Sequence, residues 1–254
     1  MIARLKSLFQ QQSTKEPTLK GLPDNHRVYA VGDIHGRLDL LEVVHQKIFQ
    51  HAQAYQGTKI VVYLGDYIDR GPHSKQVIDY LLDHELPAFK TVYLLGNHEQ
   101  VLLQFIEGQA LDVAHDWFTF GGLSTLQSYG VTLRGIPSSK DLPRIFADFS
   151  EKCPVSHRQF YRALALSFDL GGYFFVHAGI KPKQPLSKQV ANDLLWIRDE
   201  FLNSNRPYEK VIVHGHSVTE NPEIKSNRIG LDTGAYASGR LTCAVFEGER
   251  IDFL

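Results

Sequence analysis

Five apolar, β-branched runs recur along the sequence, and each ends in glycine and polar residues. They are "RVYAVGDIHG" (27–36), "KIVVYLGDYIDRG" (59–71), "TVYLLGNHEQ" (91–100), "YFFVHAGI" (173–180) and "KVIVHGHS" (210–217). Such runs are typical of buried strands. A helical pattern of apolar residues follows each of the first three, which predicts a βαβ sheet and an α/β fold. Because such sheets bind ligands beyond the carboxyl ends of their strands, we expect the polar residues to meet at one site.

Residues from about 107 to 165 break this rhythm. They include "HDWFTFGGLSTLQSYG" and two helical-looking stretches, which indicate either a helical cap over the site or a connection between two halves of a sheet. The C-terminal segments "RIGLDTGAY" and "LTCAVFEGERIDFL" predict strands with a hairpin at Glu247 to Glu249. The predicted organisation is an N-terminal tail over residues 1–22 and a single domain over residues 23–254.

The composition excludes several classes of protein. With 254 residues, 43% of them hydrophobic, the chain can bury a substantial core, while a net charge of -1 argues against a general binder of nucleic acid or acidic membranes. Cys153 and Cys243 are too isolated to predict a disulfide framework or a thiolate zinc site. No apolar run approaches the roughly 20 residues of a membrane span, and the N-terminus lacks the pattern of a secretory signal, so a cytoplasmic location is expected.

The polar residues after the strands are oxygen and imidazole donors. The stretch "YLGDYIDRG" places Asp66 and Asp69 three residues apart behind a buried strand, where carboxylates are costly unless something positive meets them. Taken singly, each polar cluster has a structural explanation, such as a turn or a core histidine. The combination suits first-row divalent metal ions. The donors are Asp33, His35, Asp66, Asn97, His98, His177, and either His214 or His216.

Three of the motifs together resemble the signature of the phosphoprotein phosphatase branch of the calcineurin-like metallophosphoesterase superfamily, which is GDxHG, GDxxDRG and GNHE. The chain has GDIHG at 32–36, GDYIDRG at 65–71, GNHE at 96–99, HAG at 177–179 and GHS at 215–217. The resemblance runs from about residue 27 to about 240, and the chain is similar in size to compact bacterial members. It implies a metallophosphoesterase fold, with mixed β-sheets packed face to face, flanked by helices in αββα layers, and a helical cap-like insertion.

The resemblance also implies two divalent metal ions, with Mn²⁺ preferred and Fe or Zn as alternatives. A carboxylate that bridges two cations about 3.5–4 Å apart lowers their mutual repulsion. Spacing alone does not choose between His214 and His216, but the family's Gly-His element favours His216. It leaves His214 either to contact the metal ligands from behind or to contact the substrate. The implied ligands are Asp33, His35 and Asp66 for one metal, and Asp66, Asn97, His177 and His216 for the other.

The implied chemistry is direct attack of a metal-bound hydroxide on phosphorus, because a metal-bound water can have a pKa near 7. A leaving alkoxide needs a proton, and His98 beside Asn97 fits the general acid. The family pairs this histidine with Asp69, which would orient the imidazole and favour its charged form. The structural alternative for Asp69 is an ion pair with Arg70 or a helix cap.

Two arginines and Asn97 are predicted to bind the substrate phosphate. Arg70 can make bidentate contacts to phosphate oxygens. Arg198 in "LLWIRDE" resembles the family's second phosphate-binding arginine, with a salt bridge on a helix surface as the alternative. Arg37 follows "GDIHG" and is first interpreted as a helix-start residue.

The expected function is a metal-dependent phosphoprotein phosphatase that hydrolyses phosphoserine or phosphothreonine, with phosphotyrosine also open. Its expected partners are phosphorylated proteins or peptides, with no nucleic acid and no evident regulatory subunit. The first alternative is a dinucleoside-polyphosphate hydrolase, such as a diadenosine tetraphosphate hydrolase. Its second motif typically lacks the aspartate of "DRG", so Asp69 and Arg70 count against it. The second alternative is an inactive, phosphate-recognising interaction module, against which the complete ligand set counts.

Overall fold

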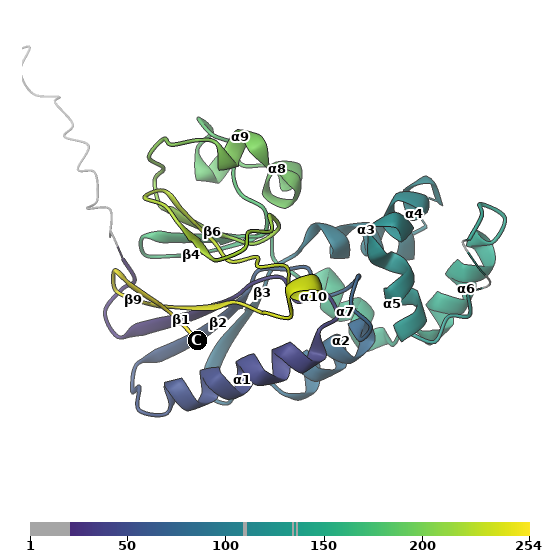
Figure 1. Ribbon diagram of the computed structural model, residues 1–254, viewed down its shortest axis with the longest axis horizontal. Helices are drawn as coiled ribbons and strands as arrows, with labels where there is room; N and C mark the ends of the chain where they lie inside the picture. The colour runs from purple at the N-terminus through teal and green to yellow at the C-terminus, as the bar shows by residue number, and fades with distance from the viewer. Residues whose placement is uncertain (1–20, 109–110, 134, 136) are drawn as a thin grey trace, which may run out of the picture.

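Two five-stranded sheets pack against each other (Figure 1). The computed structural model describes residues 21–254 except 109–110, 134 and 136. The first sheet has the order β10-β9-β1-β2-β3 and the second the order β4-β5-β6-β8-β7. The strands are β1 (His26–Val31), β2 (Thr58–Tyr63), β3 (Phe89–Tyr93), β4 (Ser167–Leu170), β5 (Tyr173–Val176), β6 (Val211–His214), β7 (Glu223–Ile224), β8 (Arg228–Gly230), β9 (Cys243–Glu247) and β10 (Arg250–Phe253).

Helices cover the outer faces of both sheets. On the first sheet Tyr29 and Val31 face α1 and α2, while Val28 and Ala30 face the second sheet, because side chains alternate along a strand. The second sheet packs its other face, including Phe174, against α8 and α9. The result is the predicted αββα layering. The helices are α1 (Leu38–Ala52), α2 (Ser74–Asp83), α3 (Asn97–Ile106), α8 (Ala191–Trp196), α9 (Asp199–Leu202), α10 (Ala235–Ser238) and the 3₁₀ helix η2 (Leu186–Lys188).

The predicted βαβ arrangement is confirmed. Strands β1, β2 and β3 are parallel, with Val31 opposite Tyr63 and Tyr63 opposite Tyr93, so all three end at the same edge. In the second sheet β5 and β6 are parallel as well. The predicted C-terminal hairpin joins β9 to β10.

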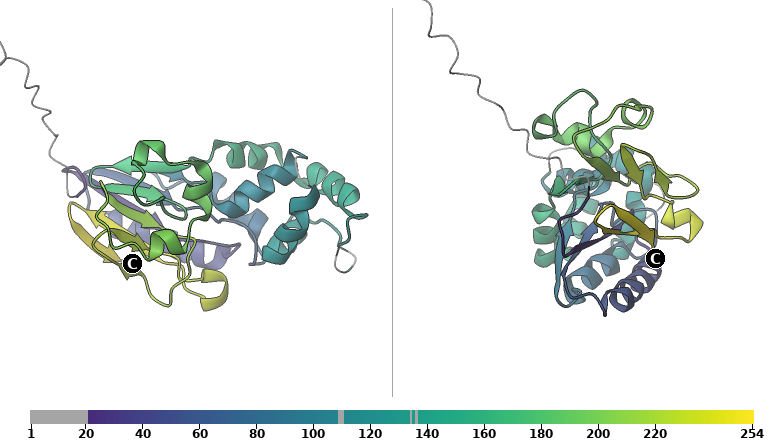
Figure 2. Two further views of the ribbon diagram at one scale, coloured as in Figure 1. Left: turned by 90° about the horizontal axis from the view of Figure 1, so that it is seen from above. Right: turned by 90° about the vertical axis from the view of Figure 1, so that its left-hand side faces the viewer.

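The region from about 107 to 165 is largely helical and forms one end of the elongated molecule (Figure 2). Trp117 and Thr125 of this region hydrogen-bond to Asp69, so it packs beside the strand ends. That this region forms a cap over the bound substrate stays a prediction. Its elements are α4 (Leu111–Trp117), the π-helix η1 (Phe118–Gly122), α5 (Leu123–Ser128), α6 (Leu142–Lys152) and α7 (Val155–Ala163).

The predicted N-terminal tail lies outside the described residues apart from Gly21 and Leu22. Leu22 is buried between the sheets, and its backbone N–H donates to Gly248. No helix among the described residues is both long enough and apolar enough to cross a membrane.

Candidate metal centre

The loops that follow the strand ends carry the predicted site residues in an uncommon backbone conformation. His35, Asp66, Asp69, Arg70 and His216 all have positive φ, between 46° and 71°. Residues other than glycine rarely adopt this conformation, and it persists only where the surrounding structure enforces it. The sharp turns redirect the side chains toward one point beyond the sheet edge.

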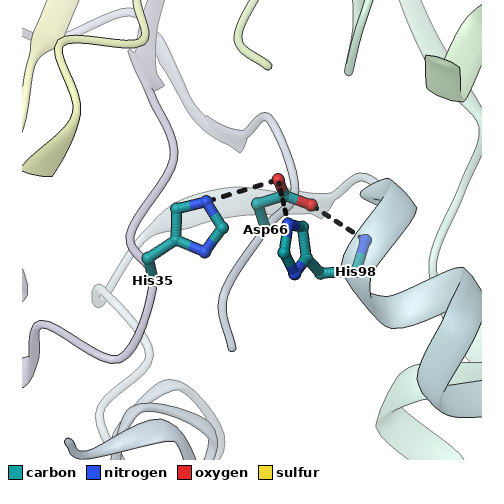
Figure 3. Close-up of side chains that lie close together, drawn as sticks. All are labelled: His35, Asp66 and His98. Atoms are coloured by element: carbon teal, nitrogen blue, oxygen red, sulfur yellow. Dashed lines mark hydrogen bonds and ion pairs between the residues drawn. The ribbon is translucent and has the colours of Figure 1, made fainter. Parts of the chain in front are cut away.

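His35, Asp66 and His98 form the first group of ligand atoms, all within 4.8 Å of one another (Figure 3). Nδ1 of His35 donates to the carbonyl oxygen of Ile68 at 2.7 Å, which leaves Nε2 with a free lone pair. That Nε2 lies 3.5 Å from Oδ2 of Asp66 and has no hydrogen-bond partner. The sequence prediction placed Asp33, instead of His98, in this group.

Asp66, His177 and His216 form the second group, again within 4.8 Å. Nδ1 of His177 donates to the carbonyl of Leu64 at 2.9 Å, so its Nε2 is also a bare acceptor. Oδ1 of Asn97 lies 2.9 Å from Nε2 of His177 and 2.9 Å from Nδ1 of His216. Asp66 belongs to both groups, as expected of a bridging carboxylate.

Asp33 and Asp232 add two further carboxyl groups, each at most 2% exposed. Asp33 accepts the N–H of His216 at 3.2 and 3.0 Å, and glycine at 215 permits this approach, since a Cβ there would lie 2.0 Å from Oδ1 of Asp33. Burial, with the charges of Asp232 and Asp66, raises the pKa of Asp33 well above its usual value. Burial also raises the pKa of Asp232 to about 6, and its Oδ2 has no hydrogen-bond partner.

The donor set fits divalent metal ions. Burial lowers the pKa of His35 and His177, and lowers that of His216 to about 2, so all three are neutral at pH 7, which is the ligating form. The Nε2 lone pairs of His35 and His177 then each lie 3.5 Å from a carboxylate oxygen of Asp66 with no proton between them. Such lone pairs repel one another unless cations lie between them.

Glu99 holds the loop that carries Asp66, a role missed in the sequence although "GNHE" contains it. Its carboxylate accepts four backbone N–H groups at 2.8–3.2 Å. Burial and the charge of Asp66 raise the pKa of Glu99. All four contacts are donors, and a protonated carboxyl would direct its hydrogen at one of them, so we infer the ionised form. The donors belong to Asp66, Tyr67, Ile68 and Gly96.

Asp69 contacts the imidazole of His98, as the resemblance implied. Nδ1 of His98 donates to Oδ2 of Asp69 at 2.6 Å. Trp117 Nε1 donates to the same oxygen at 2.8 Å, and Thr125 donates to Oδ1 at 2.5 Å. Burial disfavours a charge on His98, but Asp66 and the bond to Asp69 outweigh burial and raise the pKa of His98 to about 9. The sequence offered no signal for Trp117 or Thr125, which lie 48 and 56 residues away from Asp69.

The three arginines differ in their surroundings. Arg70 is half-buried, with Nη2 3.2 Å from Nε2 of His98. Arg198 is exposed, and its Nη1 donates to the carbonyl of His216 at 3.3 Å. Within the described part of the chain Arg198 forms no salt bridge, contrary to that alternative. Arg37 starts α1 and pairs with Asp39 at 2.7 Å, which confirms its interpretation as a helix-start residue.

The ambiguity between His214 and His216 disappears in the structure. β6 ends at His214, whose Nε2 lies 3.3 Å from Nη1 of Arg228. The chain turns sharply after Gly215, so His216 faces His177 at a distance of 3.2 Å between Nδ1 and Nε2. His214 therefore packs behind the group to which His216 belongs.

Comparison with known proteins agrees with this arrangement. The profile of the calcineurin-like phosphoesterases matches residues 26–247. A curated relative, bis(5'-nucleosyl)-tetraphosphatase PrpE [asymmetrical] of Halalkalibacterium halodurans, is 26% identical over 236 residues, covering 85% of this chain and 88% of its own. A candidate diadenosine tetraphosphatase shares the fold with a TM-score of 0.58 and 24% identity, over 94% of this chain and 95% of the other. So does a cold-active protein-tyrosine phosphatase of a Shewanella species, with a TM-score of 0.57 and 15% identity, over 92% and 80%.

The comparisons overturn the predicted phosphoprotein substrate and the predicted protein or peptide partners. The curated relatives that span the chain are named as dinucleoside tetraphosphatases. The prediction counted Asp69 as evidence against dinucleotide chemistry. Asp69 is completely buried, however, and its side chain contacts His98, Trp117 and Thr125, so it has no surface with which to select a substrate.

Proposed function

Because the chain belongs to the calcineurin-like phosphoesterase family, we propose that it is a dinucleoside-polyphosphate hydrolase that divides a four-phosphate bridge asymmetrically. Water would enter one P–O–P linkage, and the products would be a nucleoside monophosphate and a nucleoside triphosphate. The observation that carries this proposal is the alignment with the asymmetrical bis(5'-nucleosyl)-tetraphosphatases over 85% of the chain.

The metal ligands we propose are those that the strand ends bring together. Two bound divalent ions, with Mn²⁺ as our first choice, would supply Lewis-acid stabilisation of negative charge on the phosphoryl oxygens. Asp66 would contact both ions, since it lies in both groups of ligand atoms. The full set is Asp33, His35, Asp66, Asn97, His177 and His216.

Within this proposal, His98 gives its Nε2 proton to the bridging oxygen that leaves with the nucleoside triphosphate. Asp69 holds the imidazole through Nδ1, so Nε2 is the nitrogen directed toward the site. A phosphate leaving group is a much weaker base than the alkoxide of serine, so it depends less on this proton.

Two arginines flank the proposed reaction centre and would bind phosphate oxygens. Arg70 lies against His98, while Arg198 lies against His216 on the other side. A chain of several phosphates carries enough negative charge to engage both. Beside Arg70 a polar pocket of about 460 Å³ provides room for the rest of an elongated substrate. Arg70, Pro72, Gln76, Ser124, Gln127 and Ser128 line it.

Product analysis tests the proposal. Purified protein with Mn²⁺ is incubated with diadenosine tetraphosphate, and the nucleotides are separated by ion-exchange chromatography. We expect equal amounts of AMP and ATP, and no products from an Asp66→Asn control. Two equivalents of ADP would refute asymmetric cleavage, and absence of turnover would refute the proposal itself.

A further inference from the structure

Two large aromatic side chains remain open to solvent beside the metal centre. The exposed fractions are 37% for Trp196 and 39% for Tyr236. The ring of Tyr236 lies 5.5 Å from that of His35, and the ring of Trp196 lies 6.5 Å from that of His216. His35 and His216 belong to different groups of ligand atoms. One aromatic ring therefore flanks each half of the centre.

A polar contact holds the Trp196 ring, and another anchors the helix that carries Tyr236. The indole Nε1 of Trp196 donates to Oε1 of Gln100 at 2.6 Å. Tyr236 lies in α10, where Arg37 donates to the carbonyl of the neighbouring Ala235 at 2.8 Å. A ring that is already fixed loses little conformational entropy when a planar ligand stacks on it.

Each ring is also paired with a candidate phosphate-binding arginine. The Arg70 guanidinium lies 4.6 Å from the centre of the Tyr236 ring. Arg198 follows Trp196 by two residues and contacts His216, the same residue that Trp196 approaches. The metal ligands thus lie between two pairs of side chains. Each pair consists of one aromatic ring and one arginine.

We propose that Trp196 and Tyr236 are stacking platforms for the two nucleobases of the substrate, one on each side of the metal centre. The inference rests on the proposed dinucleoside-polyphosphate hydrolysis and names the residues that recognise the nucleoside ends. A phosphate chain needs only cations and arginines, whereas a purine offers a flat π-face that stacks on any aromatic ring. Two bases joined by one phosphate chain match two rings separated by one phosphate site.

Kinetic measurements on substrates with and without nucleobases test whether the two rings are stacking platforms. We compare KM for diadenosine tetraphosphate and for inorganic tetrapolyphosphate, which has the same phosphate chain but no base. Trp196→Ala and Tyr236→Ala should each raise KM for the dinucleotide about tenfold or more and leave KM for tetrapolyphosphate within about twofold. Tyr236→Phe should restore the wild-type KM, because stacking requires the ring and not the hydroxyl.

The control variant is Phe49→Ala, which removes an aromatic ring from α1 that is 49% exposed. It should change neither KM. Equal increases for both substrates in the Trp196 and Tyr236 variants would overturn the inference, because they would indicate a disturbed phosphate site. Unchanged KM for the dinucleotide would overturn it as well.

Fluorescence separates this inference from the proposed function. The chain has only two tryptophans, and Trp117 is 1% exposed, so quenching by an added nucleotide reports on Trp196. Diadenosine tetraphosphate should quench the wild type saturably and leave Trp196→Phe unquenched. Quenching without hydrolysis would refute the proposed function but support the platform. Hydrolysis with no saturable quenching would refute the platform at Trp196 and leave the function standing.

Discussion

Nδ1 of His98 lies 2.6 Å from Oδ2 of Asp69, and the two side chains are 4% and 0% exposed. The bond connects the loop after β2 to the first turn of α3. The helical region that includes α4 contacts the same loop, because Trp117 donates a hydrogen bond to Asp69. We therefore propose that Asp69 acts on the substrate only through His98.

Asp69→Asn should lower kcat on diadenosine tetraphosphate about 10- to 100-fold with both metal ions retained. Beside the larger effect of Asp66, the charge of Asp69 also raises the pKa of His98; the amide removes that second charge and no longer fixes the proton on Nδ1. Metal content by elemental analysis and kcat against pH check this. Asp79→Asn is the matched control, because Asp79 pairs with His157 at 3.0 Å outside the site. Equal loss of activity in both variants would contradict the proposed role.

Glu99→Gln should lower the free energy of unfolding by about 1–3 kcal/mol, because the new amide N–H groups face backbone N–H donors. Affinity for metal should fall about 10- to 100-fold, since Asp66 loses its support. Urea denaturation and metal titration by calorimetry measure the two effects. A variant with wild-type metal affinity would show that Glu99 does not position Asp66.

The two groups of ligand atoms should be separable by mutation. His35→Asn should lose one metal ion and His177→Asn the other, whereas Asp66→Asn should lose both. The check is the ratio of metal to protein after dialysis. Loss of both ions from His35→Asn would mean that the groups do not bind independently.

Metal should also stabilise the fold, because it neutralises the buried carboxylates of Asp33 and Asp66. At one hundred times its Kd, a bound ion adds about 2.7 kcal/mol to the free energy of unfolding. Thermal unfolding with EDTA and with added Mn²⁺ measures the difference. A midpoint that does not depend on metal would contradict the proposed centre.

His45 should make the free energy of unfolding decrease as the pH is lowered. It is 5% exposed and bonds to the Tyr63 hydroxyl at 2.6 Å, and burial, with a smaller effect of His84, lowers its pKa from 6.5 to about 4. Between these values the unfolded chain binds a proton that the folded chain does not. The contribution is therefore complete above pH 6.5 and is lost as the pH falls toward 4, by at most about 3 kcal/mol.

Urea denaturation between pH 4.5 and 7.5 measures this dependence. His45→Gln should reduce the slope of the free energy of unfolding against pH by up to about 1.4 kcal/mol per unit in this range. The other buried histidines titrate in both the wild type and the variant, so their contribution to the slope cancels in the comparison. An unchanged slope would show that His45 does not titrate as described.

The family resemblance implied the αββα layers, whereas local sequence patterns were sufficient for the βαβ sheet and for the residues at the strand ends. The reason is geometric: parallel strands end at one edge, so Asp33, Asp66 and Asn97 must approach each other once β1, β2 and β3 pair. The same patterns led to the wrong substrate, because a motif records which residues are present and not which of them face the ligand.

What the sequence by itself determined was the α/β sheet, the order of its elements and the set of donors suited to metal. The tertiary structure alone decided that His216 and not His214 turns toward His177, that Glu99 supports Asp66, and that Trp117 reaches Asp69 from 48 residues away. Strand and helix periodicity is a local property of the chain. The direction of a side chain after a sharp turn, and contacts between distant segments, depend instead on how the whole molecule packs.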